Sequence, residues 1–286
     1  MDADTLTRPA PPAHPTAHAS VGELLRHWRQ HRRWSQLELA NEAEVSTRHL
    51  SCMETGRSLP SREMLLRLAE RLGVPLRERN RLLTAAGYAP MYRERPLADP
   101  AMQPALAAVQ RVLHAHDPYP ALAVDRHWNL VAHNRAAGAF MVGLPDELLA
   151  PPLNVLRVSL HPNGLAPRIA NFAAWRDHLF ERLAHQVQAS ADADLAALAD
   201  ELRALPLPPG TAAGCEAPAG PRGSVELAVP LQLHSPAGLL SFISTITVFG
   251  TPVEVTLSEL AIEAFFPADE FTGRALARMA AAEASD

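Results

Sequence analysis

Residues 20–87 hold short apolar stretches at helical spacing, and capping or helix-stopping residues bound almost every one of them. Ser35, Ser46 and Ser61 stand where N-caps are expected, and Gly73 and Gly87 stand where helices should stop. Helix starts and stops at such short intervals exclude long helices, and the helical spacing of the apolar residues argues against extended strands. It predicts a compact all-α domain of five helices: residues 21–31, a second helix after Ser35, and residues 47–54, 62–72 and 76–86.

The same region carries a spaced motif, Ser35-Gln36-x2-Leu39-Ala40-x2-Ala43-x-Val45-Ser46-x3-Leu50-Ser51-x2-Glu54-x-Gly56-Arg57-x2-Pro60-Ser61. Ala40 is small enough for two helices to cross closely, while Val45 and Leu50 can fill the core beneath the turn. The motif resembles the helix-turn-helix of the XRE type, the lambda-repressor-like family, and the resemblance covers residues 20–87. It implies that the helix beginning after Ser46 enters the major groove of double-stranded operator DNA.

Helix geometry predicts four outward-facing positions that would contact bases: Thr47, Arg48, Ser51 and Cys52. By similarity to the family, Thr47, Arg48 and Cys52 match base-contacting positions. Arg48 is the best candidate for a bidentate contact to guanine; the alternatives are a phosphate contact or a solvated side chain. Gln36 matches a phosphate-contacting position, and Arg57 is expected to contact phosphate too.

One position departs from the family pattern. The turn before Ser46 usually contains glycine, whereas this chain has Glu44. We therefore expect Glu44 to adopt a left-handed backbone conformation at some energetic cost. The alternative to DNA binding is a five-helix module that binds protein.

Charge is unevenly distributed along the chain. Residues 20–95 contain 14 Arg and nine acidic residues, a net charge of +5, whereas residues 96–286 contain 11 Arg and 20 acidic residues, a net charge of -9. A basic module can approach a polyanion and an acidic one should avoid it. We therefore expect nucleic acid to contact only the N-terminal part.

The rest of the chain predicts a mixed α/β domain. Helices are expected at 105–115, 134–142, 154–160, 169–190, 192–205, 259–266 and 268–282. Strands are expected at 121–125, 128–132, 225–234, 239–249 and 253–257, which would form a five-stranded antiparallel sheet. The predicted organisation is a disordered tail (1–19), a DNA-binding domain (20–87), a connector (88–104) and a second domain (105–286).

Five runs are similar to the MmyB-like transcriptional regulators: HLSCMETGRSLPSREMLLRLAE, PLRERNRLLTAAGYAP, DPYPALAVDRHWNLVAHNRAA, NVLRVSLHPNGLAPRIANFAAW and STITVFGTPVEVTLSELAIEAFFPAD. The resemblance spans residues 20 to about 280. It implies a PAS-like C-terminal domain that binds a small apolar or amphipathic ligand, such as a fatty acid. We also expect a homodimer, because a dimer reads two half-sites.

Aromatic residues are the first candidates for a ligand pocket, although each could equally be core: Trp128, Phe140, Phe172, Trp175, Phe242 and Phe249. Asn154, Arg157 and His161 would share one helical face, and Arg157 or Arg168 could hold a carboxylate. The alternative is that these arginines pair with acidic residues and stabilise the fold: Asp125, Asp177 or Glu181.

The sequence gives little support to other classes of protein, such as enzymes, metal-binding proteins and membrane proteins. No GxSxG, P-loop or GxGxxG motif is present, so we expect neither an enzyme nor a cofactor. The pairs His114-x-His116 and His127-x5-His133 lack further ligands with metal-site spacing, so no metal is expected. The longest charge-free run, 227–253, is broken by Pro and Gly and predicts no membrane span. We expect a cytoplasmic regulator; the alternative is a DNA-binding protein whose second domain mediates only protein–protein interaction.

Overall fold

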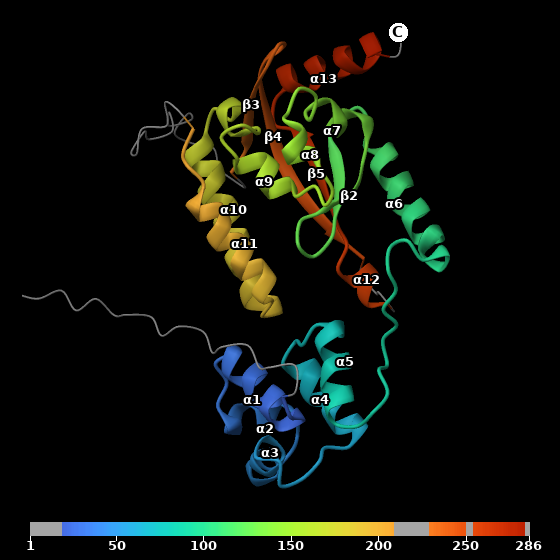
Figure 1. The fold of residues 1–286 in the computed structure, drawn as a ribbon, viewed down its shortest axis with the longest axis vertical. Coiled ribbons are helices and arrows are strands. Elements are labelled where there is room, and N and C mark those ends of the chain that lie inside the picture. The colour runs from blue at the N-terminus through green and yellow to red at the C-terminus, as the bar shows by residue number, and fades with distance from the viewer. Residues whose placement is uncertain (1–18, 209–228, 250–253, 284–286) are drawn as a thin grey trace, which may run out of the picture. The chain divides into compact units, whose positions relative to one another are not determined.

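The computed structural model describes residues 19–208, 229–249 and 254–283. The chain forms two compact units: an N-terminal unit up to Glu94 with the segment Gln188–Ala193, and a C-terminal unit of Arg95–Val187 and Asp194–Asp286 (Figure 1). The division falls inside the segment 88–104. The predicted tail lies almost entirely outside the described residues.

The N-terminal unit consists of the five expected helices, which are α1 (Val21–His31), α2 (Gln36–Glu42), α3 (Thr47–Glu54), α4 (Arg62–Arg71) and α5 (Leu76–Ala85). Ser35 caps α2 and forms a capping box with Glu38. The Ser46 hydroxyl accepts the backbone N–H of His49 at the start of α3. The predicted helical domain, with the helix-turn-helix formed by α2 and α3, is confirmed.

A single apolar core joins these helices. Leu25, Leu39, Leu50 and Met53 are fully buried in it. Leu37 of α2, in contrast, is 59% exposed. Gly22 lies against the carbonyls of α3, where a Cβ atom would come within 2.5 Å of the Met53 oxygen. The close crossing of α1 and α3 therefore requires glycine there.

The C-terminal unit is a five-stranded antiparallel sheet with helices, as predicted. Its strands are β1 (Ala121–Val124), β2 (Leu130–His133), β3 (Leu231–Ser235), β4 (Gly238–Val248) and β5 (Ala261–Pro267), in the order β2-β1-β5-β4-β3. Its helices are α6 (Gln103–Ala115), α7 (Arg135–Ala139), α8 (Asp146–Leu149), α9 (Val155–Leu160), α10 (Phe172–Ser190), α11 (Ala193–Ala204), α12 (Val255–Ser258) and α13 (Glu270–Glu283), with 3-10 turns at Pro100–Met102 and Ala166–Arg168.

The sheet packs helices on both faces. Helix α6 covers one face through Val109 and Leu113, and α9, α10 and α11 lie on the other (Figure 1). The central strand β5 shows the alternation: Ile262 joins the α6 side, whereas Ala261 and Phe265 pack on the α10 side.

Two predicted elements near the C-terminus are wrong. The expected strand 253–257 is the short helix α12 where it is described, and the expected helix 259–266 is strand β5. Ser258 is a good N-cap residue and suggested a helix starting there. The period-two pattern of β5 was obscured by alanine and glutamate, which are good helix formers, and pairing with β1 and β4 outweighs their local preference. No helix within the described residues is long and apolar enough to cross a membrane.

Candidate functional site

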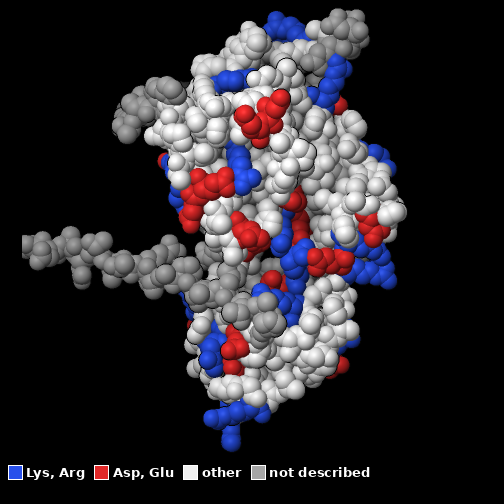
Figure 2. Space-filling view, in the orientation of Figure 1, with Lys and Arg blue, Asp and Glu red and all other residues white. Residues whose placement is uncertain are grey.

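Helix α3 presents its first turns to solvent. Arg48 is exposed, and Thr47, Ser51 and Cys52 are half-buried, whereas Leu50 faces the core. The predicted base-contacting residues therefore lie together on the outer side of one helix. Basic side chains stand at the end of the N-terminal unit where α3 lies (Figure 2). Such basic side chains attract the phosphate groups of a polyanion.

The turn between α2 and α3 adopts the expected conformation. Glu44 has a φ of 55°, in the left-handed region where glycine is usual. The Val45 N–H donates to the Ala40 carbonyl at 2.9 Å, which closes the turn. The backbone strain predicted from the missing glycine is therefore present, and the surrounding hydrogen bonds offset it.

Glu54 anchors the far end of α3, and sequence analysis missed this role. Its side chain is fully buried and accepts hydrogen bonds from Arg29 Nε at 2.6 Å and Arg29 Nη2 at 2.8 Å. The Gln36 amide, at the start of α2, also donates to Glu54, at 2.8 Å. One carboxylate thus fixes α1, α2 and α3 relative to one another. The sequence did contain a signal for this role, because Glu54 is a charged residue at a position of the motif that faces the core.

The two predicted phosphate-contacting residues have different surroundings. Gln36 is half-buried and its amide is held by Glu54, so its orientation is fixed. Arg57 is exposed in the loop after α3, and its backbone N–H donates to the Cys52 carbonyl at 2.8 Å. Its side chain is available to a ligand at the surface beside α3.

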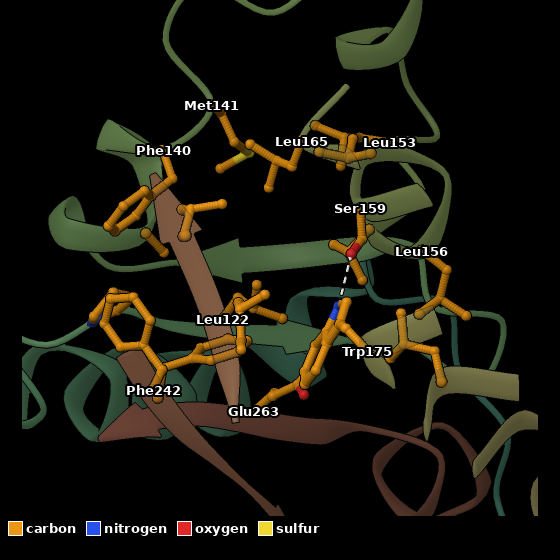
Figure 3. Close-up of a pocket in the computed structure, with 18 of the residues that line it drawn as sticks. Leu122, Phe140, Met141, Leu153, Leu156, Ser159, Leu165, Trp175, Phe242 and Glu263 are labelled. Atoms are coloured by element: carbon orange, nitrogen blue, oxygen red, sulfur yellow. Dashed lines mark hydrogen bonds between the residues drawn. The ribbon is translucent and has the colours of Figure 1, made fainter. Parts of the chain in front are cut away.

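The C-terminal unit contains an apolar cavity of about 110 Å³. It lies between the sheet and the segments that include α7, α9 and α10 (Figure 3). Its lining residues are Pro120, Leu122, Ala137, Phe140, Met141, Leu153, Val155, Leu156, Val158, Ser159, Leu165, Trp175, Leu179, Arg182, Leu231, Leu233, Phe242, Glu263 and Phe265. A mostly apolar lining with a few polar groups is typical of a small-molecule site.

Three of the predicted aromatic residues, Phe140, Trp175 and Phe242, line this cavity (Figure 3). The Phe140 and Phe242 rings meet edge to face at 5.9 Å. Trp128 and Phe172 belong to the surrounding core and do not line the cavity. Phe249 packs with the cluster on the α6 side of the sheet, away from it.

None of the four predicted polar residues, Asn154, Arg157, His161 and Arg168, lines the cavity. Asn154 is the N-cap of α9 and also donates to the His127 carbonyl, at 2.8 Å. The expected shared helical face is not formed, because α9 ends at Leu160 and the His161 ring instead accepts the Asn163 N–H. Arg168 donates weakly to the His234 and Phe140 carbonyls, each at 3.4 Å.

Arg157 pairs with Glu201, so all three predicted acidic partners were wrong. Its Nε and Nη2 donate to the two carboxylate oxygens at 2.6 and 2.7 Å, and both side chains are nearly half exposed. The hydrogen bond to Glu201 raises the pKa of Arg157, and the same bond lowers the pKa of Glu201. This pair lies at the surface, where it contributes little to stability.

The charged side chains of the cavity wall are Arg182 and Glu263, which sequence analysis did not single out. Arg182 Nη1 donates to Glu263 Oε1 at 2.8 Å, and the side chains are 18% and 5% exposed. The Arg182 guanidinium also lies 4.3 Å from the centre of the Trp128 ring. The signal was a lone acidic residue inside the apolar alternation of residues 261–267.

A helix-turn-helix unit with an exposed, well-anchored α3, together with a separate unit containing an apolar cavity, defines a DNA-binding regulator that carries a ligand-binding domain. The family models agree with this class. A model described as the MmyB-like transcription regulator ligand binding domain matches residues 105–279, and one described as a helix-turn-helix domain matches residues 20–82. The first covers more than half of the chain, so the chain belongs to the MmyB-like transcription regulators. No curated protein matches it.

Proposed function

We propose that the protein is a one-component transcription regulator that binds operator DNA sequence-specifically through α3. In this proposal Arg48 makes the main base contact, with Thr47, Ser51 and Cys52 beside it. Gln36 and Arg57 contact phosphate and set the orientation of the helix. The exposure of Arg48 next to a fully buried anchor, Glu54, supports this assignment.

The C-terminal domain would sense a small apolar or amphipathic molecule of the acyl-chain, fatty-acid-like class. The observation that carries this proposal is the apolar cavity in the domain that the family model matches. Because a cavity of roughly 150 Å³ holds one benzene molecule, a cavity of about 110 Å³ has room for about four or five carbon atoms. A longer chain would require the segments around α7 and α9 to move.

Movement of this kind is what a sensor needs. A ligand changes DNA affinity only if it binds two conformations of the protein unequally. A chain that fills the cavity and displaces its wall meets this condition, and the 88–104 connector would carry the change to the DNA-binding unit.

We further propose that the protein acts in the cytoplasm as a homodimer. Ile243 and Phe266 pair across β4 and β5 and are 38% and 43% exposed, which supports an apolar self-association surface on the sheet. The same exposed residues favour the second candidate function, a C-terminal domain that recruits another protein and needs no ligand. Saturable binding of a small apolar molecule in the cavity separates the two.

The first experiment selects operator sequences from random duplex DNA with the full chain, and then measures affinity by fluorescence anisotropy at fixed salt. A defined sequence that Arg48→Ala no longer prefers supports the DNA-binding assignment. Repeating the titration with 1-hexanol present tests sensing. An operator affinity that stays the same at saturating hexanol contradicts the proposed coupling.

A further inference from the structure

The cavity is apolar except for a few polar side chains in its wall. Apart from the Trp175 indole N–H, which donates to the Ser159 hydroxyl at 3.1 Å, these are Ser159, Arg182 and Glu263. Glu263 stands on β5, the central strand, opposite Leu122 of β1. Arg182 reaches it from α10.

The charges of this wall already balance. Arg182 and Glu263 are 2.8 Å apart and largely shielded from solvent, so the wall has no net charge. His178, one turn before Arg182 on α10, adds no second cation at neutral pH, because burial and the nearby Arg182 charge lower its pKa. Any ion that entered would therefore bring an uncompensated charge into a poorly solvated site, which is costly.

The wall nevertheless has unused hydrogen-bonding capacity. Among the described residues, Glu263 Oε2 accepts no hydrogen bond, and Arg182 Nε and Nη2 donate none. The Ser159 hydroxyl accepts from Trp175 and donates to no described group. The residues that carry this acceptor and these donors line the cavity.

We infer that the cavity selects a neutral amphipathic molecule, with an apolar chain and an uncharged head that both donates and accepts a hydrogen bond, over the corresponding carboxylate. A primary alcohol is the simplest example. Its hydroxyl donates to Glu263 and accepts from Arg182, whereas a carboxylate meets the Glu263 charge. This inference rests on the proposed sensing function: it keeps the acyl chain of the proposed ligand and replaces the carboxylate of a fatty acid with a neutral head group.

Isothermal titration of the full chain at pH 8 with three six-carbon probes tests the inference. We expect 1-hexanol to bind at least about tenfold more tightly than hexanoate. We also expect 1-hexanol to bind more tightly than 2-hexanone, because a ketone accepts but cannot donate to Glu263. Hexanoate or 2-hexanone binding at least as tightly as 1-hexanol overturns the inference.

Ionised acids enter any apolar cavity poorly, so weak binding of hexanoate to the wild type is not specific to Glu263. A variant that removes the Glu263 charge is therefore the more specific test. Glu263→Gln leaves Arg182 without its counterion, and hexanoate should then bind at least as tightly as 1-hexanol. Glu201→Gln, which removes an acid from the surface pair with Arg157, is the matched control and should keep the wild-type order. An unchanged order in a folded Glu263→Gln protein contradicts the inference. If that variant does not fold, the wild-type comparison with 2-hexanone decides.

The outcomes also separate the inference from the proposed function. Failure of all three probes to bind removes the proposed ligand class, and the inference falls with it. Tight binding of hexanoate alone leaves ligand sensing intact and overturns only the choice of a neutral head group.

Discussion

Both units bury an arginine–glutamate pair, and the two pairs differ in how fully their hydrogen bonds are used. In the N-terminal unit, Glu54 accepts from Arg29 twice and from Gln36 once, and its side chain is 0% exposed. In the C-terminal unit, Glu263 accepts one hydrogen bond from the side chains of the described residues and borders a cavity.

This difference distinguishes a structural pair from a pair suited to binding. Burying a charge is costly. A buried ion pair that serves only to stabilise the fold should therefore have every polar atom hydrogen-bonded, as at Glu54. A buried carboxylate with an unused oxygen beside apolar space leaves part of that cost uncompensated. A ligand that supplies the missing hydrogen bond would offset it, and this reasoning underlies the proposal for Glu263.

The largest expected effect is that of Glu54→Gln on stability. Loss of the charge of the fully buried Glu54 leaves the largely buried Arg29 uncompensated and should cost about 3–5 kcal/mol of the free energy of unfolding. Chemical denaturation of the full chain, followed by circular dichroism, measures it. The surface variant Glu201→Gln is the control. A loss as small as that of the control would show that the Glu54 network is not structural.

Glu263→Gln should destabilise the C-terminal unit less, by about 1–3 kcal/mol, because the Arg182 side chain is 18% exposed, against 11% for Arg29, and bulk water can partly solvate its charge. The same denaturation experiment compares the two variants directly. If Glu263→Gln proved the more damaging of the two, the contrast drawn above would be reversed, with the Glu263 pair as the main structural one.

Arg48→Ala should leave stability unchanged and weaken operator binding by about 1–3 kcal/mol, or about 5- to 150-fold, through the loss of a base contact. Arg111→Ala, which removes an exposed arginine from α6, is the control for net charge. Anisotropy titrations on the selected operator and on a random duplex measure both. An equal loss of affinity for the operator and for the random duplex would indicate that Arg48 contacts phosphate and not a base.

The smallest effect concerns the surface pair of Arg157 and Glu201. The hydrogen bond from Arg157 lowers the pKa of Glu201 below its ordinary 4.5, so the stabilisation is present above that pH and is lost as pH falls through the folded-state pKa. With both side chains nearly half exposed, it should be below about 1 kcal/mol. Denaturation midpoints of wild type and Glu201→Gln should differ slightly at pH 7 and converge in acid. A gap that widened in acid would contradict this assignment.

The sequence predicted the N-terminal unit well because its signals are local. Ser35 and Ser46 each cap a helix within three residues, and the left-handed Glu44 follows from a single missing glycine. In the C-terminal unit the sheet was predicted, but the alternation of β5 was misread as a helix. Strand β5 owes its conformation to pairing with β1 and β4, which lie far away in sequence.

The polar side chains of the cavity were missed for the same reason. Arg182 and Glu263 are 81 residues apart, and no local pattern connects them. The predicted helical face of Asn154, Arg157 and His161 was a local argument, and it failed because Asn154 and His161 are the two caps of α9 and do not lie within the helix. Phe140, Trp175 and Phe242 were found because large aromatic residues are common in both cores and pockets.

The most direct test of the account is whether the cavity binds a small apolar molecule. Leu165 lines the cavity and is only partly buried, so Leu165→Trp should fill the space without unfolding the domain. Val112→Trp, at an exposed position of α6, is the matched control. We predict saturable one-to-one binding of 1-hexanol by calorimetry in wild type and Val112→Trp, and its loss in Leu165→Trp. Equal binding by all three proteins, or by none, would contradict the account.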